Sequence, residues 1–259
     1  MVKVAFNYGR EHTLQVPFLL EKGFAKLKNV KIVDCGDSPD LVVNSMPWNE
    51  IRHGKKTVYW ELDIAEKNYA STYTYFDKVY LPSNMKKELW TDNCSFLPMA
   101  VDFDYYHPPA IEEKPEYDVI FMGRMDRAYR EEWIKKLSEK FNVLNTGAER
   151  GLPTTTTLSK GKCSFQVSHY GNLEQRNFEY SAVVPMVLER VPDIEVFKEN
   201  DHYRGFDTGN YDEFEKQIEW CVKNYKKARE MRDRMVKHLF ENHTYTHRAK
   251  QILKDVNLR

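Results

Sequence analysis

A chain of 259 residues is long enough for one large domain or two small ones, and 41% hydrophobic residues suffice to build packed cores. Lys plus Arg and Asp plus Glu are both 39, so the formal net charge is zero, which argues against a broad basic face of the kind that non-specific nucleic-acid binders use. The four cysteines are far apart, form no CxxC pair and are expected to be reduced thiols.

Short apolar runs of strand length alternate with longer amphipathic stretches in the first half of the chain. The predicted strands are residues 2–6, 30–34, 40–44, 56–60, 78–82 and 95–99. Residues 13–29 carry apolar residues at helical spacing, which predicts the first crossover helix, and residues 86–90 predict a short helical piece. The tyrosine-rich residues 69–80 are interpreted as half-buried strand and loop. This alternation is typical of an α/β protein with a mostly parallel sheet.

A second α/β series begins after residues 100–115, which hold three prolines and several charges and are interpreted as a linker. The predicted strands are residues 117–123, 141–147, 162–168 and 183–189, and the predicted helices are residues 131–140, 178–182, 212–227, 228–242 and 244–256. The threonine run at residues 154–157 is predicted to be a loop.

The fold class that follows is α/β, with two Rossmann-like domains whose mostly parallel sheets face a central cleft. We expect the domains over residues 1–109 and 110–243, and a last helix over residues 244–259 that packs back toward the first domain. Open α/β sheets bind ligands at the carboxyl ends of their strands, so the cleft is the expected site. The chain opens on a strand-like run and has no stretch of roughly 20 apolar residues, which predicts a cytoplasmic protein without a membrane span.

Four segments carry a resemblance to a known family: LPMAVDFDYYHPP (97–109), YDVIFMGRMDRAYREEWIKKL (117–137), NLEQRNFEYSAVVPMVLER (172–190) and HTYTHRAKQIL (243–253). In order and spacing they resemble the GT-B glycosyltransferases, and within them the group-1 transferases related to the CgeB spore-maturation proteins. The resemblance implies a hexosyltransferase that moves a sugar from a nucleotide sugar, expected to be a UDP-sugar, to an acceptor hydroxyl with retention. It also implies that the first domain binds the acceptor and the second binds the donor.

Gly123 ends a predicted strand ahead of a helix, and a residue without a side chain lets backbone N–H groups approach a diphosphate. Arg124, Arg127 and Arg130 follow, and a guanidinium can bind phosphate oxygens through two parallel hydrogen bonds. The resemblance implies that a basic pair here neutralises the departing nucleoside diphosphate. We assign Arg124 and Arg127 to this role. Arg130 fits either that role or a solvated helix face paired with neighbouring glutamates.

Glu179 opens a predicted helix, and the resemblance implies that its carboxylate accepts hydrogen bonds from the ribose hydroxyls of the nucleotide. The alternative is an acidic residue that complements the helix dipole. Arg176, three residues earlier, is expected near the same phosphates. Many family members carry a further Glu eight residues before the ribose carboxylate to hold the donor sugar. Here that position is Gly171, and Glu174 is the candidate substitute.

Acceptor chemistry is expected from the first domain. His12 lies in the loop after the first strand and is a candidate for binding the acceptor or orienting its hydroxyl, although a lone loop histidine is more often solvated. Asp63 follows Trp60 and Glu61 at the end of another strand. It fits either a general base or the cap of the following helix, and the cap is slightly favoured.

The triplet Asp102-Phe103-Asp104 resembles the DxD metal motif of the other glycosyltransferase fold. We reject a metal site here because the triplet lies in the linker, without a preceding strand to aim both carboxylates at one cation. The resemblance implies a metal-independent enzyme in which basic side chains and helix dipoles replace the ion. We therefore expect no metal and no cofactor beyond the nucleotide sugar as co-substrate.

The acceptor stays open at this stage. A glycan, a protein site and a hydroxymethylated base of phage DNA all fit, and a monomer or weak dimer is expected. A second hypothesis is a nucleotide-sugar-binding module that has lost catalysis, prompted by Gly171 and the short first domain. A dinucleotide-dependent oxidoreductase is disfavoured because no GxGxxG follows either opening strand.

Overall fold

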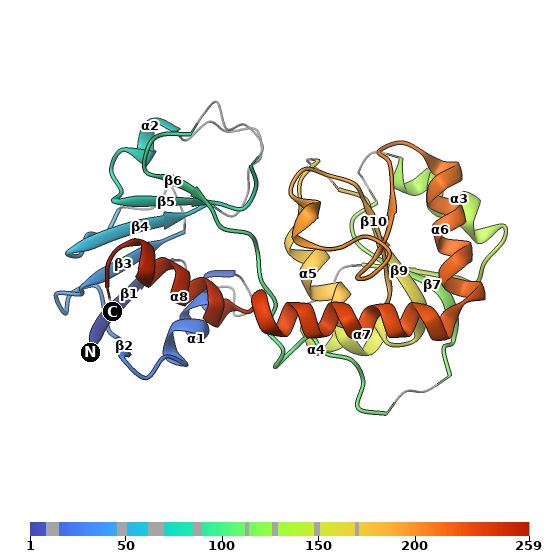
Figure 1. The fold of residues 1–259 in the computed structure, drawn as a ribbon, viewed down its shortest axis with the longest axis horizontal. Helices are drawn as coiled ribbons and strands as arrows, with labels where there is room; N and C mark the ends of the chain where they lie inside the picture. The colour runs from blue at the N-terminus through green and yellow to red at the C-terminus, as the bar shows by residue number, and fades with distance from the viewer. Residues whose placement is uncertain are drawn as a thin grey trace. The chain divides into compact units, whose positions relative to one another are not determined.

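The chain folds into two compact units, each an α/β layer structure (Figure 1). The structure is a computed structural model that describes residues 1–8, 16–45, 51–61, 70–84, 90–111, 114–125, 129–147, 151–168 and 171–258. Unit 1 comprises Met1–Ala100 together with His243–Arg259, and unit 2 comprises Val101–Asn242. The first boundary therefore falls at Ala100, ahead of the proline pair at residues 108–109 where the sequence placed it.

Unit 1 is built on a parallel sheet with the strand order β2-β1-β3-β4-β5-β6. Its strands are β1 Val2–Asn7, β2 Val30–Ile32, β3 Leu41–Asn44, β4 Lys56–Trp60, β5 Lys78–Leu81 and β6 Cys94–Phe96. Its helices are α1 Val16–Ala25, α2 Ala70–Tyr73 and α8 Tyr245–Asp255. The central strands β3 and β4 are almost entirely buried, as expected for parallel strands that are covered on both faces.

Helix α8 completes unit 1 although it lies at the far end of the sequence. A Cβ atom at Gly23 in α1 would lie 2.5 Å from the backbone carbonyl of Tyr245, so only glycine lets the two helices approach this closely. The buried guanidinium of Arg248 donates to the carbonyl oxygens of Pro98 (2.7 Å) and Met99 (2.8 Å). Burial lowers the pKa of Arg248 to about 10. These contacts tie the C-terminal helix to the strap that follows β6.

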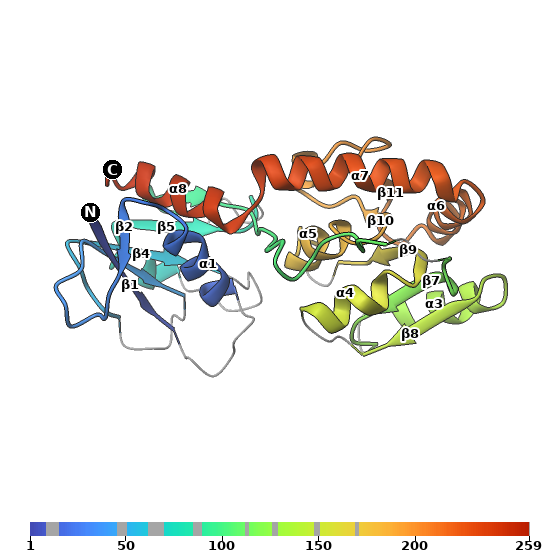
Figure 2. The ribbon, with the colours of Figure 1, turned by 90° about the horizontal axis from the view of Figure 1, so that it is seen from below.

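Unit 2 contains a second parallel sheet with the strand order β11-β10-β9-β7-β8. Its strands are β7 Tyr117–Met122, β8 Val143–Thr146, β9 Gly161–Gln166, β10 Met186–Glu189 and β11 Arg204–Phe206. Its helices are α3 Arg130–Ser138, α4 Leu152–Leu158, α5 Gln175–Ser181, the 3-10 turn η2 Ile194–Val196, α6 Tyr211–Lys223 and α7 Tyr225–Asn242. In Figure 2 the long helix α7 runs beside α5, in agreement with their contacts.

One face of this sheet carries the core of unit 2. Alternate residues Val119 and Phe121 of β7 share a buried cluster with Trp133 of α3 and Phe214 of α6. The ring of Trp133 stacks on that of Phe214 with centroids 4.7 Å apart. Offset aromatic stacking of this kind adds about 0.5–1.5 kcal/mol beyond the burial of apolar area. Helices α3 and α6 are therefore held on the same face of the sheet.

The predicted parallel α/β architecture is confirmed, and every strand predicted from an apolar run is present within one to three residues of its expected ends. The loop prediction for residues 154–157 is wrong, because Leu152–Leu158 form α4. Tertiary contacts override the weak helix propensity of threonine there: Thr154 is fully buried, and the Thr155 hydroxyl donates to the carbonyl oxygen of Tyr105 (2.6 Å). Of the helical piece predicted at residues 86–90, only Trp90 lies within the described residues.

Each of the four cysteines is free, with Cys163 and Cys221 buried and Cys35 and Cys94 partly buried. The hydrogen bond to Cys221 and then burial raise the pKa of the Cys163 thiol. Within the described residues, no helix is both long and apolar enough to span a membrane.

Candidate functional site

The carboxyl ends of β7 and β9 mark the switch point of the unit 2 sheet. The chain leaves β7 for β8 on one side and returns to the other side of β7 at β9, so connections leave these two strand ends in opposite directions. Ligands of open α/β sheets bind at such points, where diverging loops leave a crevice. Gly123 and Arg124 follow β7, and Val167 and Ser168 follow β9. A ligand site in unit 2 is expected among these residues.

Gly123 and Arg176 lie against each other at this strand end. A Cβ atom on Gly123 would be 3.2 Å from Nη1 of Arg176 and 2.9 Å from the ring of Phe121. Arg176 belongs to α5, yet its guanidinium lies over the turn that ends β7. The absence of a side chain at Gly123 leaves the space that the guanidinium occupies. The structure thus brings together two residues that are 53 positions apart and that the sequence assigned to the same phosphates.

Arg130 holds the two loops of the switch point together. Its side chain is only 3% exposed, and Nη1 donates to the carbonyl oxygen of Arg124 (3.2 Å) while Nη2 donates to that of Val167. Its guanidinium also lies over the ring of Phe121, 5.8 Å from the centroid. Neither sequence interpretation anticipated this. A solvated helix face is excluded by the burial, and the donors face backbone carbonyl groups, so Arg130 positions the loop that carries Arg124.

A buried carboxylate anchors the loop after β9 from the other side. Glu189 ends β10 and is 4% exposed; its Oε2 accepts from the backbone N–H of Ser168 (2.7 Å) and its Oε1 from the Tyr129 hydroxyl (3.1 Å). Burial and then the charge of Glu189 raise the pKa of Tyr129. The sequence analysis missed Glu189, although a charged residue that closes an apolar strand is a readable signal of a function at the strand end.

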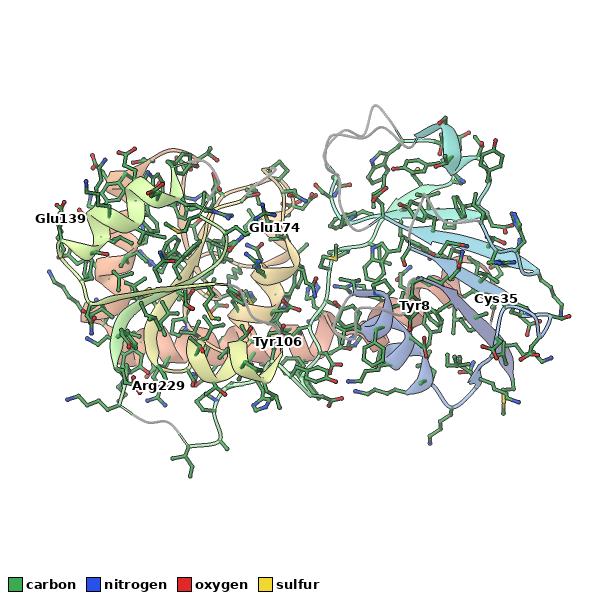
Figure 3. The ribbon with its side chains drawn as sticks, turned by 180° about the vertical axis from the view of Figure 1, so that it is seen from behind. Tyr8, Cys35, Tyr106, Glu139, Glu174 and Arg229 are labelled. Carbon is green, nitrogen blue, oxygen red and sulfur yellow. The ribbon has the colours of Figure 1, made fainter. Side chains whose placement is uncertain are left out.

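Glu174 caps α5 and takes part in the same network (Figure 3). Its carboxylate accepts from Nε2 of Gln166 (2.9 Å) and from the Ser168 hydroxyl (3.5 Å), and a capping box links it to Asn177. A sugar hydroxyl bound by Glu174 would share the carboxylate with these groups. The neighbouring Gly171 has φ +68°, a left-handed conformation that glutamate adopts only under strain. The backbone therefore accounts for glycine at the position where many family members carry Glu.

Glu179 lies on the inner side of α5. It is 6% exposed, and its Oε1 accepts from Nε2 of Gln175 (2.5 Å), one turn earlier in the helix. Glu179 sits near the end of this helix, which begins at Gln175, so the interpretation as an N-terminal charge complementing the dipole does not apply.

Several predicted residues cannot be placed. His12, Asp63 and Arg127 lie outside the described residues. Of their neighbours, Glu61 is described at the end of β4: it is 6% exposed and accepts from the Tyr59 hydroxyl (2.9 Å). The structure therefore describes the end of the strand that precedes Asp63, but the role of Asp63 as a general base or helix cap stays a prediction.

The Asp102-Phe103-Asp104 triplet forms a turn. Oδ1 of Asp102 accepts from the backbone N–H of Asp104 (2.9 Å), and the carbonyl oxygen of Asp102 accepts from the N–H groups of Tyr105 and Tyr106. Among the residues that the structure describes, no group of three His, Cys, Asp or Glu side chains is arranged to hold a metal ion.

Comparison with known proteins gives several structures of the same fold. HepE from Anabaena, solved with UDP and glucose, has a TM-score of 0.67 at 11% identity, with 99% of this chain and 100% of that chain covered. The β-glucosyltransferase of phage T4 in complex with UDP-glucose has a TM-score of 0.59 at 14% identity, covering 99% and 98%. TarM has a TM-score of 0.57 at 10% identity, and the match covers 92% of this chain but only 57% of TarM. No curated protein matches the sequence.

These likenesses confirm the predicted fold class, two Rossmann-like α/β units of the GT-B glycosyltransferases. The sequence itself matches a family model described as glycosyl transferase-like over residues 108–254, which is more than half of the chain. That range contains the switch point of unit 2, the network around Arg130 and Glu189, and all of α8 except its last residue, Asp255. The chain therefore belongs to the glycosyl transferase-like family.

Proposed function

We propose that the protein transfers a sugar from a UDP-sugar to an acceptor hydroxyl, with the UDP moiety bound in unit 2 at the carboxyl ends of β7 and β9. The observation that carries this is the guanidinium of Arg176 lying over Gly123 at the switch point. A diphosphate there would meet the cationic guanidinium of Arg176. HepE and the phage T4 enzyme were solved with UDP and glucose or UDP-glucose, which supports UDP-glucose as the first donor to test.

In this proposal each assigned residue has one task. Arg176 and Arg124 neutralise the diphosphate as it leaves. Arg127 is assigned to the same task from the sequence. Arg130 and Glu189 hold the loops after β7 and β9 so that these groups converge. Glu179 accepts from the ribose hydroxyls, and Glu174 is the candidate for the donor sugar.

The transfer forms a bond between the acceptor oxygen and C1 of the donor sugar while the bond from C1 to the diphosphate oxygen breaks. The electron pair leaves with UDP, and the acceptor proton passes to a base, for which His12 and Asp63 are the sequence candidates. The family resemblance favours retention of configuration at C1. The product anomer, read by the coupling constant of its anomeric proton, tests this point.

A melting-temperature screen against nucleotides and nucleotide sugars tests the donor site, because a ligand that binds only the native state raises the Tm. We expect UDP and UDP-sugars to raise the Tm and GDP-sugars to leave it unchanged. A shift with GDP-sugars alone would refute the UDP assignment. UDP release in the presence of an acceptor panel then separates an enzyme from an inactive binding module, which would bind without turnover.

DNA is a second candidate acceptor, because the β-glucosyltransferase of phage T4, a DNA-modifying enzyme, matches nearly the full length of both chains. Labelled UDP-glucose with duplexes that contain hydroxymethylated or unmodified cytosine tests it directly. Label that enters only the hydroxymethylated duplex would establish DNA as the acceptor. The zero net charge gives no general support for affinity to DNA.

A further inference from the structure

Unit 1 contains a hollow of about 460 Å³ beside the carboxyl ends of β1 and β2. Its volume falls within the range of about 300–1,000 Å³ that is usual for small-molecule sites. It lies on the β2 side of β1, whereas the switch point of this sheet is on the other side, between β1 and β3. Every described residue that lines the hollow belongs to unit 1, to β1, β2, α1 and the segments that follow the two strands.

One wall of the hollow is an ordered aromatic and carboxylate surface. The ring of Phe6 meets that of Tyr8 edge to face, with centroids 6.2 Å apart, and the Tyr8 hydroxyl donates to Oε2 of Glu21 (2.6 Å). Tyr8 and Cys35, which also lines the hollow, are labelled in Figure 3. Because Tyr8 is held by both contacts, its ring and the Glu21 carboxylate are positioned before any ligand arrives.

The residues that line the hollow carry a net negative charge, which disfavours the binding of anions. Three carboxylates, those of Glu21, Asp34 and Asp37, line the hollow, against one ammonium group, that of Lys31. Carboxylates repel phosphate groups, so a nucleotide or a nucleic-acid backbone is disfavoured here. The same carboxylates accept hydrogen bonds from hydroxyl groups, and aromatic rings offer apolar surface to the C–H face of a pyranose. This combination suits an uncharged saccharide.

We propose that this hollow binds an uncharged saccharide portion of the acceptor, an inference that rests on the proposed function and names the acceptor class as carbohydrate. Phe6 and Tyr8 supply the apolar contact, and Glu21, Asp34 and Asp37 accept from sugar hydroxyls. A nucleic-acid acceptor would leave these three carboxylates without a matching partner. The transferase then binds its anionic donor on unit 2 and a neutral acceptor on unit 1.

The cysteines of the chain provide a direct readout. Cys35 lines the hollow, and Cys94, also partly buried, lies in β6 of the same unit and does not line it. Iodoacetamide labelling of the full-length protein with UDP present is followed at each cysteine by peptide mass spectrometry, with increasing methyl glucoside or maltose. We expect the saccharide to slow labelling of Cys35 several-fold and to leave Cys94 unchanged. Equal rates at Cys35 with and without saccharide would overturn the proposal, as would equal slowing at both cysteines.

A double variant tests the carboxylates. Glu21→Gln with Asp34→Asn keeps the size of both side chains and removes two charges, so the saccharide concentration that protects Cys35 should rise about tenfold. Asp92→Asn, at an exposed position of the same unit, is the matched control and should leave protection unchanged. Protection by inorganic phosphate, or by glucosamine but not by neutral sugars, would overturn the assignment to an uncharged saccharide.

The two proposals fail separately. The Tm shift with UDP reports the donor site in unit 2, and Cys35 protection reports the hollow in unit 1. A normal UDP shift without protection would remove the saccharide site and leave the transferase proposal intact. Protection without any UDP shift would refute the donor assignment and leave a saccharide-binding unit.

Discussion

The two units share one sheet architecture but end their central strands with different chemistry. In unit 2 the strand ends of the switch point are surrounded by Arg124, Arg130 and Arg176 and braced by Glu189. In unit 1 the corresponding ends of β1 and β3 carry two amides, and Nδ2 of Asn7 donates to Oδ1 of Asn44 (2.8 Å). Among the described residues at these ends, cationic side chains gather in unit 2 only.

In the proposed reaction this difference would separate the anionic donor from a neutral acceptor by charge. A nucleoside diphosphate needs cations whose positions are fixed before it binds, and in unit 2 the buried hydrogen bonds of Arg130 to backbone carbonyl groups fix the loop that carries Arg124. A neutral acceptor needs hydrogen-bonding groups and apolar surface, which unit 1 offers. If the comparison holds, changes that weaken unit 1 should leave UDP binding unaltered, and changes at the unit 2 switch point should alter UDP binding with little effect on stability.

The largest effect is expected from Arg248→Met. The change leaves the carbonyl groups of Pro98 and Met99 without their donor in a buried site, which should lower the free energy of unfolding of unit 1 by about 3 kcal/mol. Urea unfolding followed by tryptophan fluorescence measures it. Lys254→Met, exposed on the same helix, is the control and should cost little. Equal stability of the two variants would show that α8 does not depend on this guanidinium.

Gly23→Ala should destabilise unit 1 by about 2 kcal/mol, because the added methyl group meets the backbone carbonyl of Tyr245 and α1 must move away from α8. Gly36→Ala, where nothing lies within 4 Å, is the matched control. The affinity for UDP should be unchanged in both. A loss of UDP affinity in Gly23→Ala would break the separation between the units.

Arg176→Ala should weaken UDP binding roughly thirtyfold, as expected for the loss of a charged hydrogen-bonding partner of a phosphate. Isothermal titration calorimetry measures the Kd, and Arg234→Ala on α7, which pairs with Asp201, is the control. Arg176→Lys should lie between the two because it keeps the charge but not the paired donors. Unchanged UDP affinity in Arg176→Ala would remove the switch-point assignment.

Gly123→Ala should weaken UDP binding about fivefold, because the new methyl group displaces the guanidinium of Arg176 and crowds Phe121. Gly147→Ala, after the neighbouring strand β8, meets nothing within 4 Å and serves as control. Combined with Arg176→Ala, the Gly123→Ala effect should shrink, since both act on the same group. If the effects of the two substitutions on the free energy of UDP binding simply added, Gly123 would not act through Arg176.

The smallest effect concerns pH. Burial and then the stacked ring of His238 lower the pKa of His202, whose Nδ1 accepts from the N–H of Lys198 (3.1 Å). The unfolded chain therefore binds more protons than the folded chain as the pH falls through 6.5, and stability declines there. We expect a small fall in Tm below pH 6.5 that His202→Gln reduces. Burial lowers the pKa of His247 in unit 1 in the same direction, which accounts for a remaining part of the fall. An unchanged pH profile in that variant would assign the decline to other groups.

The sequence predicted the elements built from runs of apolar residues and missed some of those built from polar residues. Strands such as β7 were visible because uninterrupted apolar runs have few alternatives in an α/β chain. Helix α4 was not, because four threonines have a weak helix propensity, and the contacts that favour the helix, such as the bond from the Thr155 hydroxyl to the carbonyl of Tyr105, are tertiary. The short strand β11, Arg204–Phe206, lacks an apolar run altogether.

The candidate site shows the same limit. The sequence identified Gly123 and Arg176 through the resemblance, and the structure adds that they touch. The burial of Arg130 and its two carbonyl partners could not be read from a stretch rich in charged residues, because the partners lie at residues 124 and 167. Long-range pairing decides which of several arginines reaches a ligand.

The position of α8 also sets the order in which the chain can mature on the ribosome. Unit 2 is one uninterrupted segment, whereas unit 1 is split, and its closing helix follows unit 2 in the chain. Domains fold as they emerge from the ribosome, and synthesis proceeds at roughly 5–20 residues per second. The second unit can therefore reach its native state during synthesis, while the first must wait, with the surface around Gly23 uncovered, until α8 has been synthesised after unit 2.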